Sequence, residues 1–357
     1  MEKKWFDAVI VGGGVIGASI FAQLIESGMT SVALIEKSSF AQGSTGKSGG
    51  MLRTYHPDSY LSDLAFESMP VFLNFRDLYR GECGYTQTGF VFLEPVNRGE
   101  DAFREVARIN SKLPVLQILD LDKAKLPIRF ENVGVAIYEE RGGYGDPVQT
   151  TLSWIKYGRE QGGIAYEGVE VKNLIVQSGK VSGIETSIGR MESDVVIVAA
   201  GAWSKMLLEG LSSEADCIRT KAIQMNAYIC PEGITGPPPF IDNTTQLYSR
   251  PGPGGIISIG APTDQWDIHP DQQYSVDSLA VEYVKNQAVK RLSWMTSAAV
   301  SGGKRSFDAY TADNRGILSS SDQVKGLFIC SGWSGGGYKI APEVGRLVKN
   351  SVISYLS

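Results

Sequence analysis

Apolar and polar residues alternate along this chain in patterns that predict both buried strands and helices. Residues 7–36, DAVIVGGGVIGASIFAQLIESGMTSVALIE, read as an apolar strand, a glycine turn, a helix and a second apolar strand that ends on an acid. Four further segments are predicted to be helical, namely residues 61–80, 99–112, 144–162 and 275–293. Strand-like runs occupy residues 84–96, 164–171, 173–177, 180–186 and 194–204, and the final elements are a strand, a glycine loop and a helix from about residue 341. This mixture predicts an α/β fold.

The turn after the first strand fits the pattern G-x-G-x-x-G at Gly12, Gly14 and Gly17, and Glu36 follows Gly17 by 19 residues. Gly12 permits a tight turn, Gly14 lets the backbone approach a pyrophosphate, and Gly17 lets helix and strand pack closely. The helix N-terminus directs free N–H groups and a positive dipole end at phosphates, and Glu36 can accept hydrogen bonds from a ribose. The segment therefore predicts a dinucleotide site, without distinguishing FAD from NAD(P) or a cofactor from a substrate.

Composition places the chain among soluble globular proteins, and its 357 residues favour two domains. The hydrophobic content of 43% is ordinary, and the net charge of −5 gives no electrostatic basis for binding nucleic acid or acidic membranes. No stretch has the ~18 consecutive apolar residues of a membrane-spanning helix. Lys3 and Lys4 precede an apolar run as in a secretory signal, but cleavage there would remove the glycine turn, so we expect a cytoplasmic protein.

The residue types that bind metals are sparse in this sequence. Only two histidines occur, His56 and His269, and the second lies in the polar stretch DQWDIHPD that predicts a loop. No C-x-x-C spacing is found among the four cysteines, which are Cys83, Cys217, Cys230 and Cys330. The sequence therefore predicts no metal site, and we expect free, buried thiols in a reducing compartment.

Several segments together resemble the D-amino-acid oxidase and sarcosine oxidase family of FAD-dependent oxidoreductases, in particular its glycine oxidase and sarcosine oxidase-like branch. Besides the glycine turn, DVVIVAAGAWS (194–204) is similar to the family's second FAD strand, and GVEVKNL resembles the strand whose valine, here Val171, contacts adenine. FDAYTADNRGIL (307–318) is similar to the family's Y-T-x-D segment, and GLFICSGWSGGGYKIAP to its flavin loop and closing helix. The resemblance covers nearly the whole chain.

The resemblance implies a Rossmann-like FAD-binding domain interrupted by a second, mixed-sheet (α+β) substrate domain. The discontinuous FAD-binding domain is expected to comprise residues 1–80, 144–222 and 305–357, and the substrate domain residues 81–143 and 223–304. FAD is expected to bind non-covalently, because the family's flavin-linked cysteine falls at Asp308 and Cys330 lies in the final strand.

The resemblance also carries cofactor-binding roles to residues in each quoted segment and in the Gly- and Ser-rich stretch after Glu36. The last glycine loop and the helix N-terminus behind it would stabilise negative charge near flavin N1 and the C2 carbonyl. The predicted cofactor-binding residues are Gly12, Gly14, Val15, Ile16, Gly17, Glu36, Lys37, Ser44, Thr45, Ser48, Gly49, Gly50, Met51, Val171, Ala200, Gly201, Trp203, Gly332, Ser334, Gly335, Gly336, Gly337, Tyr338 and Lys339.

Five residues are the candidates for catalysis and substrate binding. Arg53 in MLRTYH and Lys339 in GGGYK match the family positions that hold a substrate carboxylate, where Arg suits a bidentate clamp and Lys adds a point charge. Tyr248 and Tyr310 resemble the family's pocket tyrosines, and His56 lies three residues beyond Arg53. The resemblance implies oxidation of the C–N bond of an amino acid or N-substituted amino acid by hydride transfer to flavin N5, giving an imine that hydrolyses.

Other interpretations stay open at this point. AQGSTGKS (41–48) fits a relaxed phosphate-loop pattern, but SGGMLRTYHPDS after it carries Gly-Gly and Pro instead of the helix that a nucleoside triphosphatase needs. A 2-hydroxy-acid dehydrogenase would share the carboxylate clamp, and a flavoprotein subunit or assembly factor would act on or with another protein. Between Ser258 and His269 there is no counterpart of the oxygen-activating lysine of monomeric sarcosine oxidase, so the electron acceptor, oxygen or a quinone, stays open. Homo- and hetero-oligomers are both compatible with the sequence.

Overall fold

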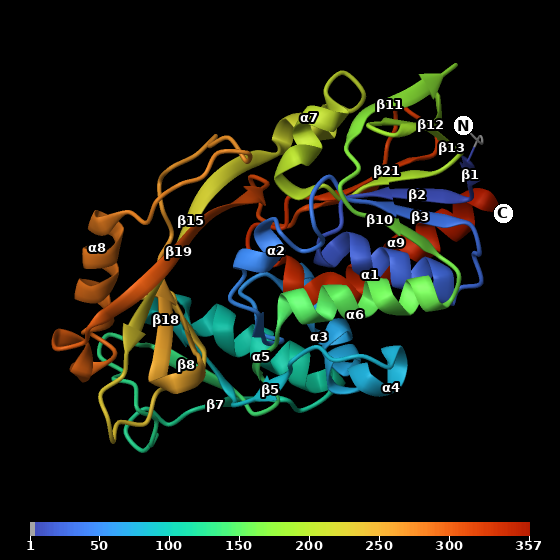
Figure 1. The fold of residues 1–357 in the computed structure, drawn as a ribbon. Helices are drawn as coiled ribbons and strands as arrows, with labels where there is room; N and C mark the ends of the chain where they lie inside the picture. Colours follow the sequence, from blue (N-terminus) through green and yellow to red (C-terminus); the bar gives the residue numbers. More distant parts are fainter. Residues whose placement is uncertain (1–3) are drawn as a thin grey trace.

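The computed structural model describes residues 4–357, which form two large sheets with helices packed against them (Figure 1). The first sheet has six strands, in the order β10 (Ile164–Tyr166), β3 (Val32–Ile35), β2 (Ala8–Val11), β14 (Val196–Val198), β21 (Leu327–Ser331) and β20 (Ile317–Ser320). The strands from β10 to β21 are parallel to their neighbours, and β20 is antiparallel to β21. Its central strands are continuous apolar runs because both faces of the sheet are covered.

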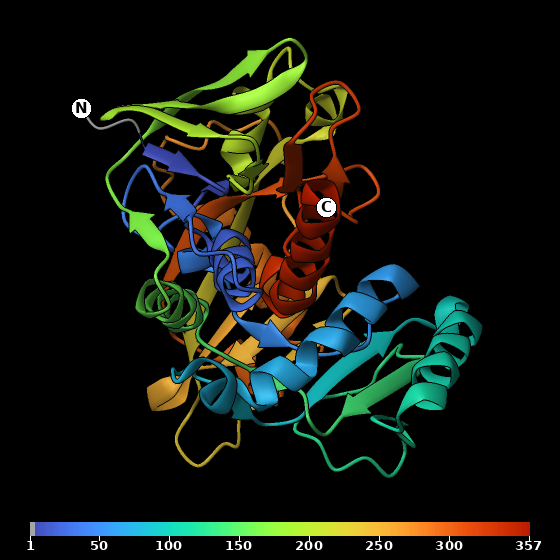
Figure 2. The ribbon, with the colours of Figure 1, turned by 90° about the vertical axis from the view of Figure 1, so that its right-hand side faces the viewer.

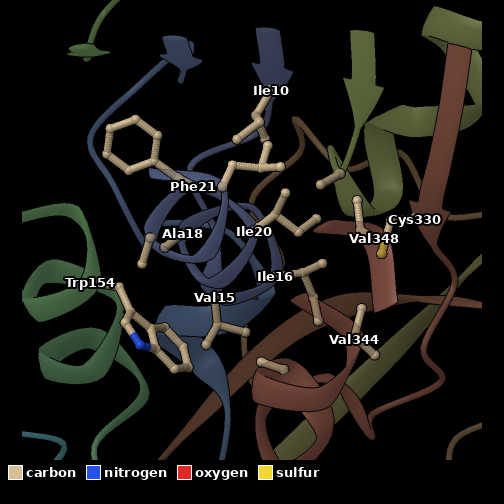
Figure 3. Close-up of a cluster of buried hydrophobic side chains, with 14 of the residues drawn as sticks. Ile10, Val15, Ile16, Ala18, Ile20, Phe21, Trp154, Cys330, Val344 and Val348 are labelled. Carbon is tan, nitrogen blue, oxygen red and sulfur yellow. The ribbon is translucent and has the colours of Figure 1, made fainter. Parts of the chain in front are cut away.

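Three helices cover one face of this sheet, α1 (Val15–Glu26), α6 (Pro147–Glu160) and α9 (Gly337–Leu356) (Figure 2). Figure 3 shows part of the core between them, in which Trp154 from α6 lies beside Val15 on one side of α1 and Val344 from α9 lies beside Ile16 on the other. Burial of such side chains contributes about 1.5–3 kcal/mol each. This layer therefore fixes the position of the N-termini of α1 and α9.

A second sheet covers the other face of the six strands. It consists of β1 (Lys4–Phe6), β13 (Gly189–Ser193), β12 (Lys180–Thr186) and β11 (Val171–Gln177), and the short helix α7 (Ser204–Leu208) packs beside it. The resulting layers, helices on one face and a small sheet on the other, confirm the Rossmann-like α/β fold that the sequence predicts.

Helix α9 is attached to α1 by polar contacts as well as by apolar packing. Ser19 Oγ donates to the carbonyl of Ala341 at 2.8 Å, and Gln23 Nε2 donates to the carbonyl of Pro342 at 2.6 Å. A Cβ at Gly345 would come within 2.5 Å of Ser19 Oγ. A side chain at Gly345 would therefore collide with Ser19 and Gln23, the residues that hold α9, so glycine at this crossing keeps the two helices close and the start of α9 in place.

The other large sheet has eight strands, mostly antiparallel, in the order β19 (Val300–Tyr310), β15 (Arg219–Ile229), β18 (Ile256–Gly260), β17 (Leu247–Pro251), β16 (Phe240–Asp242), β6 (Phe90–Glu94), β8 (Val135–Glu139) and β7 (Leu116–Ile118). Helix α5 (Gly99–Lys112) packs on the β6–β8 end and α8 (Ser278–Ala288) on the β15–β18 end. This sheet confirms the predicted mixed α+β portion.

The two longest strands connect the regions of the molecule. Figure 1 shows β15 and β19 extending side by side between α7 and α8, and both run unbroken across the expected domain boundaries at 222/223 and 304/305. The division into two domains at those residues stays a prediction.

Several smaller elements differ from the pattern-based expectations. The helical pattern of residues 61–80 forms two helices, α3 (Ser59–Leu73) and α4 (Phe75–Tyr79), because Asn74 leaves helical geometry at φ −116° and ψ 20°. The last helix begins at Gly337 instead of about residue 341. The polar stretch after Glu36 forms the one-turn helix α2 (Ser44–Lys47) and the strand β4 (Met51–Leu52), which pairs with β9 (Gly143–Tyr144), itself paired with β5 (Thr86–Gln87). A four-residue helix is not the long helix of a phosphate loop.

The cysteines are free, but they are not all buried. Cys83 and Cys330 are buried, Cys230 is half-buried, and Cys217 is exposed because it lies in a surface 3₁₀ turn, so the expectation of burial was wrong for Cys217. Among residues 4–357, no group of His, Cys, Asp or Glu side chains is arranged to hold a metal ion. None of the helices in this range is long and apolar enough to cross a membrane.

Candidate active site

A cavity of about 1030 Å³ lies beyond the carboxyl ends of β2, β3, β14 and β21, where open parallel sheets place their ligands. Gly12, at the end of β2, has φ +113°, and a Cβ there would lie 2.5 Å from the carbonyl oxygen of Ala199. Gly17 does not line the cavity, but a Cβ on it would lie 2.0 Å from the carbonyl oxygen of Gly12. The first glycine therefore makes the turn and the third permits the close helix–strand contact.

The N-terminus of α1 faces this cavity, and side chains of neighbouring loops hold its backbone. Gly13 N donates to Glu36 Oε2 at 2.7 Å, and Val15 N donates to Thr45 Oγ1 at 3.0 Å. Ser38 N donates to the other Glu36 oxygen at 2.9 Å. The Glu36 carboxylate is thus held at the end of β3 on the wall of the cavity.

At one end of this large cavity, an acid from a distant segment contacts two predicted cofactor residues. Asp271 Oδ1 lies 2.5 Å from Lys37 Nζ and accepts a hydrogen bond from Trp203 Nε1 at 2.8 Å, and Lys37 lies 4.2 Å from the centre of a Trp203 ring. Val171 lines the same cavity. Sequence reasoning missed Asp271, because the polar stretch around His269 predicts only a loop and carries no motif.

Helix α9 begins where the large cavity meets a second one. The preceding loop has two glycines of positive φ, Gly332 at +80° and Gly335 at +79°, so the chain can turn sharply into the helix. Gly335 and Tyr338 line both cavities. The free N–H groups and positive dipole end of a 20-residue helix therefore point at this junction.

The second, inner cavity has a volume of about 340 Å³ and is bounded by β15, β19, β4 and the start of α9. The structure brings all five predicted substrate or catalytic residues to its wall, Arg53, His56, Tyr248, Tyr310 and Lys339. Every predicted cofactor-binding residue except Gly17 lines one of the two cavities.

Arg53 is a buried cation that makes no ion pair within residues 4–357. Its guanidinium carbon lies 5.4 Å and 5.5 Å from the ring centres of Phe90 and Phe92, and Nη2 is 3.4 Å from His56 Nδ1. Burial lowers the pKa of Arg53 to about 10, against the opposing charge of Glu139, so the group stays charged at neutral pH. Glu139 accepts hydrogen bonds from Thr54 instead, and Arg53 Nε has no protein partner in the described chain.

His56 is held neutral by its surroundings. Burial and the nearby charges of Arg53 and Lys339 lower its pKa well below the ordinary value. Since Arg53 only donates hydrogen bonds, Nδ1 of His56 is the acceptor and Nε2 carries the proton. Within residues 4–357 that Nε2 has no protein partner, which leaves a donor on the cavity wall.

Lys339 occupies the first turn of α9. Its Nζ lies 3.4 Å from the carbonyl oxygen of Gly336, and burial and the charge of Arg53 lower its pKa well below the ordinary value. Asp308 opposes that effect. Burial raises the pKa of Asp308 itself to about 6, although it accepts a hydrogen bond from the backbone N–H of Ala309 at 2.8 Å. Two basic side chains and one carboxyl group thus meet where the cavities join.

The two tyrosines shape the opposite wall. Tyr248 donates its hydroxyl to the carbonyl of Gln224 at 3.1 Å, and its ring leaves no space for a Cβ at Gly260, which would lie 2.3 Å away. Tyr310 packs against Trp266 with ring centres 5.5 Å apart. Burial raises the pKa of both phenols, so both are neutral donors at physiological pH.

Sequence reasoning missed a group of cavity residues on the paired strands β15 and β19. Residues 221–225 of β15 all line the inner cavity, whereas β19 contributes alternate positions, which period-2 spacing could have indicated once the register was known. The missed residues are Lys221, Ala222, Ile223, Gln224 and Met225 on β15 and Lys304, Ser306 and Asp308 on β19.

Comparison with known proteins finds relatives over nearly the whole chain. It is 23% identical over 359 residues to the mitochondrial pyruvate dehydrogenase phosphatase regulatory subunit of Mus musculus, a match that covers 95% of the chain and 40% of that protein. It is 23% identical over 374 residues to sarcosine oxidase subunit beta of Arthrobacter sp, covering 98% of the chain and 87% of that subunit. The chain therefore spans about two fifths of the length of the first relative.

The fold has solved counterparts. The crystal structure of L-proline dehydrogenase from P.horikoshii matches with a TM-score of 0.88 at 22% identity, covering 99% of this chain and 94% of that one. The family model described as FAD dependent oxidoreductase (DAO) matches residues 7–350. The family predicted from the glycine turn, the two later strands and the final glycine loop is thereby confirmed: the chain belongs to the DAO family of FAD-dependent oxidoreductases.

Proposed function

We propose that this chain binds FAD without a covalent link and oxidises the C–N bond of an amino acid or N-substituted amino acid held in the inner cavity. The observation that carries the proposal is the pair of buried basic side chains, Arg53 and Lys339, which share the small inner cavity and have no ion-pair partner among residues 4–357. The large cavity beside it, at the carboxyl ends of the parallel strands, is termed the dinucleotide cavity. Buried charges without partners are costly, and a carboxylate ligand would supply the missing partner.

The residues of the large cavity fit FAD. The backbone at Gly12 to Val15 and the start of α1 suit a pyrophosphate, and the carboxylate of Glu36 suits a ribose. Its volume is at the upper end of the range for small-molecule sites. None of the four cysteines, all within the described residues, lines either cavity, which supports non-covalent binding.

FAD, when bound, would supply the hydride acceptor for the substrate. The chain's own residues would do the rest. Arg53 and Lys339 hold the substrate carboxylate, and their positive charge disfavours a protonated amine beside them, which keeps the nitrogen lone pair available. The N–H groups at the start of α9 stabilise negative charge at the junction. Neutral His56, Tyr248 and Tyr310 can hydrogen-bond and orient the substrate without adding charge.

Two alternatives stay open. A 2-hydroxy acid would satisfy the same cations, because the clamp recognises the carboxylate and not the amine. A flavoprotein subunit or assembly factor acting with another protein is supported by the resemblance to a regulatory subunit and by the relative's much greater length. Oxygen or a quinone as electron acceptor, homo- or hetero-oligomers and a cytoplasmic location are further proposals from the sequence.

An anaerobic flavin-reduction screen tests the proposal. The purified yellow protein is mixed without oxygen with amino acids, N-methyl amino acids and 2-hydroxy acids, and flavin absorbance is followed. Bleaching by an amine substrate, with release of a keto acid or an aldehyde, is the expected result. Bleaching only by hydroxy acids would replace the proposed substrate class, and a flavin reduced by none of these compounds would favour the non-catalytic alternative.

A further inference from the structure

The inner cavity is lined by more cationic side chains than one carboxylate requires. Five cations line it, and the only acid is Asp308; the cations are Lys47, Arg53, Lys221, Lys304 and Lys339. None of the five makes an ion pair within residues 4–357. The chain as a whole has 39 acids against 34 basic residues, so this local excess of positive charge opposes the overall balance. A cavity lined by one sign of charge concentrates ligands of the opposite sign.

The phosphates of a bound FAD would not account for the excess of positive charge in the inner cavity. The dinucleotide cavity, which would hold a diphosphate, is lined by four basic residues (Lys37, Lys47, Lys172 and Arg305) and by four acids (Glu36, Glu170, Asp271 and Asp308). Two of those basic residues are already in ion pairs, Lys37 with Asp271 and Arg305 with Asp277. Lys47 lines both cavities, so the cations specific to the inner cavity beyond Arg53 and Lys339 are Lys221 and Lys304.

Lys221 and Lys304 lie on one face of the β15–β19 pair. Lys221 is opposite Asp308, and Met225 is opposite Lys304, so the two lysines are four residue positions apart, an offset of about 13 Å measured along the strand direction. Directly opposite residues and alternate residues share a face of an antiparallel pair. The two long side chains therefore reach into the cavity from the ends of one wall.

The position of Lys221 is defined by aromatic rings and not by an acid. Its Nζ lies 4.5 Å from the centre of the Trp266 ring and 5.5 Å from that of Tyr310. Asp308, although opposite in register, makes its hydrogen bonds with the backbone N–H groups of Ala309 and Gly335 and with the Ser44 side chain, and not with Lys221. Lys221 is half-buried and Lys304 exposed, whereas Arg53 and Lys339 are buried, so the cations run from the closed end of the cavity to its mouth.

We infer that the substrate carries a second anionic group, a side-chain carboxylate, that is bound at the mouth by Lys221 and Lys304 while Arg53 and Lys339 hold the first carboxylate. This inference rests on the proposed function and names the substrate class of the same site. A monocarboxylic substrate would leave both mouth lysines in water and use only part of the cavity's charge.

The experiment uses the flavin-loaded protein and two substrates of equal size that differ in one charge, N-methylglutamate and N-methylglutamine. Anaerobic flavin reduction at several concentrations separates the limiting rate from the half-saturating concentration. We expect the diacid to half-saturate at about 10-fold lower concentration, with similar limiting rates and a difference that shrinks as salt is added. Calorimetric titration with glutarate and with butyrate gives a readout independent of turnover.

The double variant Lys221→Met/Lys304→Met should remove most of the preference for the diacid, measured as the ratio of the two half-saturating concentrations. The flavin content should be unchanged, because neither lysine lines the dinucleotide cavity. Lys125→Met, an exposed lysine distant in sequence and lining neither cavity, is the matched control and should behave as the parent protein. Equal half-saturation by acid and amide would overturn the inference while leaving the proposed function intact. A preference that survives in the double variant would also overturn it, because the second anion would then bind elsewhere. If no amine bleached the flavin, the inference and the proposed function would both be overturned. If a phosphonate analogue half-saturated at a lower concentration than the diacid, the second anionic group would be phosphate-like and not a carboxylate.

Discussion

The two cavities are built from different kinds of sequence. The dinucleotide cavity is formed by backbone turns after parallel strands, and its main device, the strand–turn–helix of residues 7–36, is contiguous. The inner cavity is formed by side chains of β4, β15, β19, the residues around Tyr248 and the start of α9, which are far apart in the chain. A site built from backbone turns, such as the dinucleotide cavity, tolerates almost no substitution at its glycines. A site built from side chains, such as the inner cavity, can be altered one residue at a time. This difference predicts which substitutions remove the cofactor and which change only the substrate.

The largest effect is expected from Gly12→Val. The residue has φ +113°, and any Cβ would come within 2.5 Å of the carbonyl oxygen of Ala199, so the turn after β2 must move. We expect purified protein without bound flavin, measured as the ratio of flavin to protein absorbance, with circular dichroism to establish that the chain is folded.

Gly162→Ala is the control for backbone strain alone. Gly162 has φ +102°, but a Cβ there meets no atom within 4 Å. It should cost about 1 kcal/mol in stability and keep the flavin. A yellow Gly12→Val protein would show that the turn is more adaptable than the comparison of the cavities claims.

The next largest effect is expected from Arg53→Ala. Removing one partner of a buried, charge-assisted contact costs about 2–5 kcal/mol, which corresponds to a fall of about 30- to 5000-fold in kcat/KM. The flavin content should be unchanged, because Arg53 lines only the inner cavity. Steady-state kinetics with the best substrate of the flavin-reduction screen measures the fall in kcat/KM, and a flavin assay measures the flavin content. Loss of flavin in this variant would mean that the two cavities are not independent.

Asp308 lines both cavities, and its titration gives a pH test. Burial raises its pKa from 3.8 to about 6, so the folded state binds a proton more readily than the unfolded state. The stability gained by protonation is fully present below pH 3.8 and is lost as the pH rises through about 6. Above pH 6 the Asp308→Asn variant should therefore be more stable than the parent protein, by about 1–3 kcal/mol in the free energy of unfolding, and should melt at a higher temperature. Near pH 4 the two proteins should differ little. Thermal melts of the flavin-free proteins at both pH values check this, and a shift of the same size at both would assign the effect to packing.

The smallest effect is expected from Asp271→Asn at the edge of the dinucleotide cavity. Lys37 and Asp271 are both partly exposed, so their ion pair contributes at most about 1 kcal/mol, and the bond from Trp203 adds a similar amount. The dissociation constant of FAD should rise about 3- to 10-fold, measured by quenching of FAD fluorescence on titration with apoprotein. Asp264→Asn, an exposed acid that makes no ion pair among residues 4–357, should leave the constant unchanged. A rise of more than 100-fold would mean that Asp271 contacts the cofactor directly.

The glycine turn could be predicted from sequence because its physical requirements are local. The positive φ at Gly12 and the close contact at Gly17 are properties of adjacent residues, and Glu36 lies at the end of the next strand. The helix α1 and the strands β2 and β3 were predicted for the same reason. The later cofactor segments and the pairing of Arg53 with Lys339 came from the family resemblance and not from any local pattern.

The remaining features depend on register and burial, which a single sequence does not contain. Lys221 and Lys304 look like surface lysines until the β15–β19 pairing places them on the wall of the inner cavity. The proximity of Asp271 to Lys37 joins residues 234 positions apart. The exposed position of Cys217 likewise follows from a surface turn that its neighbours do not predict.

The strand order of the six-stranded sheet determines when the sheet can assemble during synthesis on the ribosome. Strand β2 is made long before its partner β14, which begins at Val196, and before β21, which completes the parallel core and begins at Leu327. Lys339 and the N-terminus of α9 emerge later still, so neither cavity can close until almost all of this sequence has left the exit tunnel. Flavin loading must therefore follow translation of this segment, and nascent chains arrested before residue 337 should recruit chaperones and no flavin.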